Sequence, residues 1–194
     1  MNPSPPPGVD LSIAILSWNA RGYLRRCLAS LFNPRDPEVL EAWERAGQPL
    51  RDFPEESISW EVIVVDQQSL DGSAEMVEAE FPQAKLVRQA PNLGFAGGNN
   101  VAYRHAAGRY FLLLNSDTVV APGSLTELVR FADAHPRAGL IGPKLLNPDG
   151  TLQFSCRRYP TLPAGIFRRT PLQRFEPGGK FTGRSRRGCL SMKT

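Results

Sequence analysis

The sequence of 194 residues predicts one α/β domain with a Rossmann-like, mostly parallel sheet flanked by helices. Short, continuous apolar segments recur along the chain, which is typical of strands buried on both faces of a parallel sheet. Segments with apolar residues at helical spacing separate them. Two of the apolar runs, 62–65 and 111–114, lead into polar residues that include Asp66 and Asp117.

The first half of the domain is expected to hold two strands and two helices. The apolar run 11–17 predicts the first strand, and the apolar residues of 23–32 recur at helical spacing and predict a helix. That helix ends where Asn-Pro and Asp-Pro dipeptides follow, because proline disfavours helix continuation. A charged connection with a short helix at 39–46 leads to the second strand at 60–66.

The second half continues the alternation. Asp71-Gly72-Ser73 supplies turn and capping residues for a helix that ends near Pro82. Pro122 suits the first turn of a later helix, and Asn147-Pro148-Asp149-Gly150 suits the turn of a hairpin. The elements expected here are a helix at 74–80, a strand at 85–88, a helix that opens in 92–100 and reaches 107, a strand at 109–115, a helix at 122–135, a short strand at 140–142 and a hairpin at 144–154.

Charge is distributed unevenly and divides the chain into three expected regions. Residues 1–10 form a disordered leader without the features of a signal peptide, and residues 11–160 form the folded domain. From residue 157 onward ten Lys and Arg stand against one acid, so 161–194 form a basic, poorly ordered tail. The tail suits either plain solvation or peripheral contact with an anionic membrane surface, whereas its scattered aromatic residues disfavour nucleic acid.

Cysteine and histidine content restricts the compartment and the kinds of metal site. Three widely spaced cysteines favour a reducing cytoplasm, with the inner membrane surface as the place of any peripheral contact. No apolar run reaches the roughly 18–20 residues that span a bilayer. His105 and His135 have no Cys or His neighbours, so a histidine-based metal site is not expected.

Polar residues that follow the strands are the main candidates for a binding site, because ligands of parallel α/β sheets bind at the carboxyl ends of strands. The Asp66 carboxylate can accept hydrogen bonds from a nucleotide base or ribose, although a capping or turn role is the alternative. Asn115 and Asp117 can converge on Mg²⁺ or Mn²⁺ and on the diphosphate that the cation bridges. A turn that simply closes the strand is the alternative there.

A glycine-rich segment is a further candidate. Gly94-Phe95-Ala96-Gly97-Gly98 presents few side chains that block a ligand from the backbone, and it leads into a helix N-terminus, which favours anions. A loop whose glycines serve packing alone is the alternative. Asn99 either offers an amide to the ligand or caps the helix.

Four motifs occur in an order that resembles family 2 glycosyltransferases, with the rhamnosyltransferase-like members closest. The resemblance covers about residues 11–160 and rests on 11–19, on Val62–Asp66 with Asp71-Gly72-Ser73, on 92–99 and on 114–118. It implies the glycosyltransferase A-type fold, of which this chain forms the nucleotide-binding half. It also implies a nucleotide-diphosphate sugar donor, a saccharide or lipid-linked acceptor, Mg²⁺ or Mn²⁺, inversion at the anomeric carbon and a role in cell-surface polysaccharide synthesis.

The resemblance also implies roles by position. Asp66 contacts the nucleotide base, while Ser17 and Asn19 line the nucleotide pocket. Asp117 is the metal-binding acid of the family's Asp-x-Asp-like motif, with Asn115 in its first position. The other nucleotide-binding residues implied are Gly94, Gly97, Asn99 and Ser116.

Two departures from the family pattern qualify these expectations. Gln67-Gln68-Ser69-Leu70 replaces the usual small polar residues, which implies a different loop after Asp66. The family's catalytic base lies in a downstream acidic motif, and Glu176 is the only acid after Asp149, so the base is expected beyond Thr194. A non-catalytic nucleotide-sugar-binding module and, more remotely, a nucleotidyltransferase are the alternative functions.

Overall fold

The computed structural model describes residues 8–48, 52 and 54–153. The chain divides into two compact units, of which the larger, called the main unit below, comprises Met1–Glu44 and Gln48–Ile141. The smaller comprises Arg45–Gly47 and Gly142–Thr194. Residues 1–7 of the expected leader and the whole of the expected basic tail lie outside the described residues.

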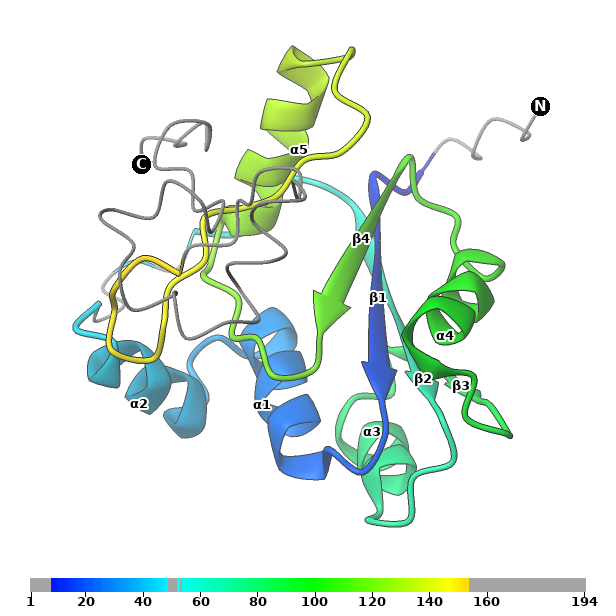
Figure 1. Cartoon of the computed structure of the whole chain (residues 1–194). Coiled ribbons are helices and arrows are strands. Elements are labelled where there is room, and N and C mark those ends of the chain that lie inside the picture. The colour runs from blue at the N-terminus through cyan, green and yellow to red at the C-terminus, as the bar shows by residue number, and fades with distance from the viewer. Residues whose placement is uncertain (1–7, 49–51, 53, 154–194) are drawn as a thin grey trace, which may run out of the picture. The chain divides into compact units, whose positions relative to one another are not determined.

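A four-stranded, wholly parallel sheet forms the centre of the main unit, with strand order β3-β2-β1-β4 (Figure 1). Its strands are β1 (Leu11–Ser17), β2 (Trp60–Asp66), β3 (Lys85–Arg88) and β4 (Tyr110–Asn115). The parallel α/β class predicted from the sequence is therefore confirmed. In this register Ser17 lies opposite Asp66, and Leu16 lies opposite Asn115, so three strands end at one edge.

Helices cover both faces of the sheet and form two separate cores. They are α1 (Arg21–Phe32), α2 (Pro37–Arg45), α3 (Ser73–Glu80), α4 (Gly94–Tyr103) and α5 (Ser124–Ala134). The larger core joins α1, α3 and α5 to one face of the sheet, through residues such as Leu28 and Val77. The smaller core packs Val101 and Ala102 of α4 against Ile63 on the other face. None of the helices in the described part is long and apolar enough to cross a membrane.

Several predicted elements are wrong in their bounds or existence. Helix α4 begins at Gly94, so it contains the glycine-rich segment, and it ends at Tyr103 rather than at 107. Helix α5 begins at Ser124 rather than at Pro122, because Gly123 adopts a left-handed conformation (φ 77°). Residues 140–142 form no strand, and the side chain of Leu140 is 92% exposed, so no apolar contact holds it in a sheet.

The hairpin expected at 144–154 is reduced to a single bridge. Leu146 pairs with Leu152 in antiparallel fashion, and the amide of Asn147 donates to the Thr151 carbonyl at 2.8 Å. Phe154, the last residue of the expected hairpin, lies outside the described residues.

Candidate functional site

The carboxyl edge of the sheet carries two buried polar atoms that lack hydrogen-bond partners among the described residues. They are Ser17 Oγ and Asp66 Oδ1, and these residues are only 1% and 4% exposed. The other carboxylate oxygen, Asp66 Oδ2, accepts a hydrogen bond from the Ser69 amide at 3.0 Å. A buried polar atom without a partner costs about 1–3 kcal/mol, so such atoms concentrate where a ligand or water supplies the partner.

The loops that follow β1 and β2 are joined by hydrogen bonds. Asn19 adopts a left-handed backbone conformation (φ 51°), its amide donates to Ser69 Oγ at 2.9 Å, and its Oδ1 accepts from the Leu70 amide at 2.8 Å. The Arg21 amide donates to Asp71 Oδ2 at 2.9 Å. The structure thus uses the Asn19 side chain to hold the two loops together at the sheet edge.

Asp71 acts in the turn before α3, as its turn-and-cap pattern predicts. Its Oδ1 accepts hydrogen bonds from the Ser73 amide at 3.1 Å and from Ser73 Oγ at 2.5 Å. Burial raises the pKa of the Asp71 carboxyl, but the hydrogen bonds from Ser73 and from the Arg21 amide outweigh it and leave the pKa below its usual value. Asp71 therefore has a structural role and stabilises the junction as an anion.

A pocket of about 480 Å³ opens beside this edge, between the starts of α1 and α4 and the ends of β1 and β4. It brings together four of the predicted site residues, Asn99, Asn115, Ser116 and Asp117. Its other lining residues are apolar or aromatic: Leu16, Ala20, Tyr23, Phe95, Leu113 and Leu114. The predicted residues Ser17, Asn19, Asp66, Gly94 and Gly97 do not line it.

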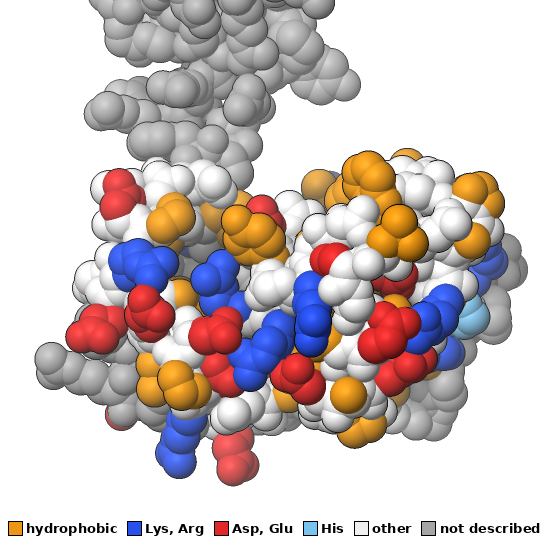
Figure 2. Space-filling view, turned by 90° about the horizontal axis from the view of Figure 1, so that it is seen from below, with side chains coloured by type: hydrophobic (Ala, Val, Ile, Leu, Met, Phe, Trp, Pro, Cys, Tyr) orange, Lys and Arg blue, Asp and Glu red, His pale blue; other side chains and the backbone are white. Residues whose placement is uncertain are grey.

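Two exposed aromatic side chains stand at this pocket, and the sequence analysis did not single them out. Tyr23 on α1 is 57% exposed and Phe95 on α4 is 61% exposed. Leu113 is half-exposed beside them, which corrects the expectation that β4 is buried on both faces, because β4 lies at the edge of the described sheet. Figure 2 looks onto the carboxyl ends of the strands and shows apolar groups on either side of a band of charged side chains.

The glycines of the 94–98 segment serve backbone conformation and close packing. Gly94 has a φ of 68°, and its amide donates to Asn92 Oδ1 at 2.8 Å. A Cβ at Gly97 would lie 2.6 Å from the Leu93 Cβ. A Cβ at Gly98 would lie 3.0 Å from the methyl groups of Leu16 on β1. The packing alternative therefore accounts for Gly97 and Gly98, while Phe95 and Asn99 on the same helix face the pocket.

Gln67 is a residue of the sheet edge that sequence reasoning noted only as a departure from the family pattern. Its side chain is buried, its Oε1 accepts from the Leu93 backbone amide at 3.0 Å, and its backbone amide donates to the Ser17 carbonyl at 2.9 Å. Gln67 thus links the end of β2 to the glycine-rich segment. The signal in the sequence was a polar residue directly after Asp66, at the end of the apolar run 62–65.

The residues at the end of β4 suit a hard divalent cation. Asn115, Ser116 and Asp117 offer amide, hydroxyl and carboxylate oxygens, the ligand types that Mg²⁺ and Mn²⁺ prefer. Within the described ranges no group of three His, Cys, Asp or Glu side chains could enclose a metal. One carboxylate with further oxygen donors is a set that Mg²⁺ accepts when a ligand's phosphates supply the remaining oxygens.

Cys27 lies next to this segment and is fully buried. Burial, together with the nearby negative charge of Asp117, raises the pKa of its thiol to about 12. The thiol is therefore protonated at neutral pH in the metal-free chain.

Comparison with known proteins places these features in a family. The model of the family described as "Glycosyl transferase family 2" matches residues 12–187. An N-acetylglucosaminyl-diphospho-decaprenol L-rhamnosyltransferase of Mycobacterium tuberculosis is 30% identical over 115 residues, 54% of this chain and 38% of its own length. The succinoglycan biosynthesis protein ExoO of Rhizobium meliloti is 35% identical over 81 residues, 41% of this chain and 23% of its own.

A solved structure shares the fold. A mannosyltransferase from Pyrobaculum calidifontis, in complex with GDP-Man and Mn²⁺, has a TM-score of 0.51 at 20% identity, covering 76% of this chain and 39% of that one. The chain thus spans well under half the length of the relatives it matches.

Proposed function

Because the chain belongs to glycosyl transferase family 2, we propose that it forms the donor-binding part of an enzyme that transfers a sugar from a nucleotide-diphosphate sugar to an acceptor hydroxyl. The observation that carries the proposal is that two features of a ligand site lie at one edge of the sheet. These are the unpaired, buried carboxylate oxygen of Asp66 and the pocket that Asn115 and Asp117 line. The proposal includes inversion at the anomeric carbon.

The residues of the edge have separate tasks in this proposal. Asp66 Oδ1 and Ser17 Oγ supply the hydrogen bonds that a base or ribose requires, since both atoms lack partners in the described chain. Tyr23 and Phe95 provide apolar surface for the ligand's ring faces. Asp117, with Asn115, holds Mg²⁺ or Mn²⁺, and the bound cation neutralises the charge that develops on the leaving diphosphate.

The electrostatics of the pocket are consistent with a role for the cation. The residues that line it include one acid, Asp117, and no Lys or Arg among the described positions. A diphosphate carries several negative charges, and beside a carboxylate it is repelled unless a cation stands between them. In the proposed site, the cation therefore allows an anionic donor to bind beside Asp117.

The relatives support a proposal for the acceptor and for the location of the whole protein. One relative is a rhamnosyltransferase for a decaprenol-linked saccharide and another is a succinoglycan biosynthesis protein, so we place the whole protein in polysaccharide assembly, with rhamnose as a candidate sugar. The proposal includes a cytoplasmic location, at the inner membrane surface when the acceptor is lipid-linked. An inverting transfer needs a carboxylate base within reach of the acceptor hydroxyl, and we assign that role to no residue of the described chain.

Calorimetry tests the proposal directly. The chain is titrated with UDP, dTDP and GDP sugars, with and without Mn²⁺, and at least one is expected to bind in a Mn²⁺-dependent way. Asp117→Ala is expected to abolish the Mn²⁺ dependence and to leave the melting temperature unchanged, because Asp117 is exposed. The control is Asp52→Ala, another exposed aspartate, which is expected to bind like the wild type. Absence of binding by every sugar nucleotide would refute the donor role.

A further inference from the structure

The turn that follows β4 is held at both of its ends by side chains of α1. The Asn115 carbonyl closes the turn by accepting from the Thr118 amide at 3.2 Å, and it also accepts from Cys27 Sγ at 3.7 Å. Beyond the turn, the Val120 amide donates to Ser30 Oγ at 3.0 Å. Residues 115–120 are therefore fixed to one helix at their first and last positions.

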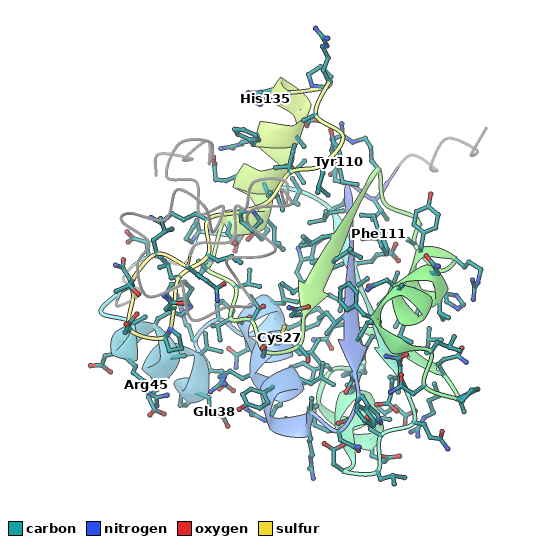
Figure 3. All side chains as sticks on the ribbon, in the orientation of Figure 1. Cys27, Glu38, Arg45, Tyr110, Phe111 and His135 are labelled. Carbon is teal, nitrogen blue, oxygen red and sulfur yellow. The ribbon has the colours of Figure 1, made fainter. Side chains whose placement is uncertain are left out.

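The two side chains that do this form a connected pair. Cys27 and Ser30 stand three residues apart on one face of α1, where they are 0% and 4% exposed. The Ser30 hydroxyl donates to the Cys27 carbonyl at 2.6 Å, which directs its lone pairs towards the Val120 amide. Figure 3 shows Cys27 on α1, next to the turn after β4. Both hydrogen bonds to the turn are thus made from a buried and well-packed base.

We propose that Cys27 and Ser30, together called the α1 clamp, are positioning residues that set the location of Asp117 and hence the affinity for the cation. The inference rests on the proposed function of Asp117 as the metal-binding acid. No hydrogen bond to the exposed Asp117 side chain occurs within the described part of the chain, so the backbone of the turn, which fixes the Cα of Asp117, sets the range of positions that the carboxylate reaches. A functional site requires its groups to be held within about 0.5 Å of the productive geometry, which gives the clamp its effect.

The chain offers a matched control for the serine of the clamp. Ser12, at the opposite end of β1, is also buried, and its Oγ donates to Glu61 Oε1 at 2.5 Å and accepts from the Gly108 amide at 2.8 Å. Ser12→Ala and Ser30→Ala each remove a buried hydroxyl that accepts from one backbone amide, while the Ser12 hydroxyl donates to a carboxylate and the Ser30 hydroxyl to a backbone carbonyl. They differ in their distance from the pocket, which Ser12 does not line.

The experiment measures the binding of UDP to the 194-residue chain by calorimetry, with and without Mn²⁺. Ser30→Ala is expected to weaken the Mn²⁺-dependent binding by about three- to tenfold relative to Ser12→Ala, the factor that one ordinary hydrogen bond carries. Metal-free binding is expected to be equal in the two variants. Hydrogen exchange gives a readout without ligand: the Val120 amide is expected to exchange faster in Ser30→Ala, and the Gly108 amide faster in Ser12→Ala.

The outcomes distinguish the clamp from the proposed function. If UDP binding by the wild type does not respond to Mn²⁺, the proposed function fails and the clamp fails with it. If the wild type responds but both variants lose affinity equally, the clamp alone is refuted. Unchanged exchange of the Val120 amide in Ser30→Ala also refutes it. Should Ser30→Ala not fold, Ser30→Cys against Ser12→Cys repeats the comparison with a weaker acceptor of similar size.

Discussion

Replacing Asp66 by asparagine separates the two roles that a buried carboxylate can have, ligand binding and structural support. The change keeps the shape of the side chain and an oxygen that accepts from the Ser69 amide. It removes the negative charge of a carboxylate whose Oδ1 has no partner in the described chain. Burying a neutral amide costs less than burying an unpaired carboxylate, so we expect a gain in stability of about 1 kcal/mol. For a protein of this size, that gain corresponds to a rise in melting temperature of about 2–4 °C.

The same substitution is expected to weaken binding. A hydrogen bond to a charged group contributes about 1.5–3 kcal/mol, so the affinity of Asp66→Asn for UDP with Mn²⁺ should fall by about tenfold or more. Calorimetry measures the affinity, and thermal unfolding followed by circular dichroism measures the stability. A more stable variant that binds less well identifies a carboxylate reserved for a ligand.

Asp36 supplies the control, because it is the other buried aspartate and both of its oxygens are engaged. Its Oδ1 accepts from the Glu38 amide at 3.0 Å, and its Oδ2 pairs with Arg25 at 3.3 Å. Asp36→Asn is expected to lower the melting temperature. A ligand role for Asp66 is refuted if Asp66→Asn is destabilised as much as Asp36→Asn and still binds UDP like the wild type, since Asp66 would then be a structural turn residue.

Other consequences of the structure can be tested in the same chain. Gly98→Ala is expected to lower the free energy of unfolding, measured in urea, by about 1–3 kcal/mol, because the added methyl group meets Leu16 on β1. Gly22→Ala has open space around the added methyl group and is expected to raise the free energy of unfolding by about 0.5–1 kcal/mol. Equal effects of the two substitutions would contradict the close packing at Gly98. Asp71 has a lowered pKa in the folded state, so its stabilisation is present above its unfolded pKa and is lost as the pH falls through the folded value. The melting temperatures of Asp71→Asn and of the wild type, plotted against pH, should therefore converge in acid. A constant difference at every pH would argue against the hydrogen bonds from Ser73 to Asp71. With the other two cysteines replaced, Cys27 should resist iodoacetamide at pH 8 until the chain unfolds, because its pKa is raised to about 12, and rapid labelling would exclude this burial.

The strands were predictable because their signal is local. The bounds of β1, β2 and β3 agree with the prediction, and the apolar runs of β1 and β2 reflect burial between two layers of helices. The run at 140–142 has the same composition but is no strand, since nothing in the sequence shows whether a sheet is there to receive it. The start of α5 was misplaced for a related reason: Gly123 takes a left-handed conformation that proline at 122 did not reveal.

The site was predictable only where strand ends determine it. Asp66 ends the buried strand β2 and Asp117 lies two residues after β4, and the parallel order brings these strand ends to one edge. The pocket wall was not predictable, because Tyr23 and Phe95 come from different helices and meet only through the packing of both on the sheet. The hydrogen bond between Cys27 and Asn115 joins positions 88 residues apart, a separation at which no local pattern gives a signal.

The position of β4 has a practical consequence for handling this chain. In the described part of the sheet β4 has a strand neighbour on one side only, and Leu113 on it is half-exposed. An open strand edge with apolar side chains is a template for pairing with another molecule. We therefore expect the purified chain to self-associate at high concentration, and light scattering of Leu113→Lys against the wild type measures how much of that association begins at this edge.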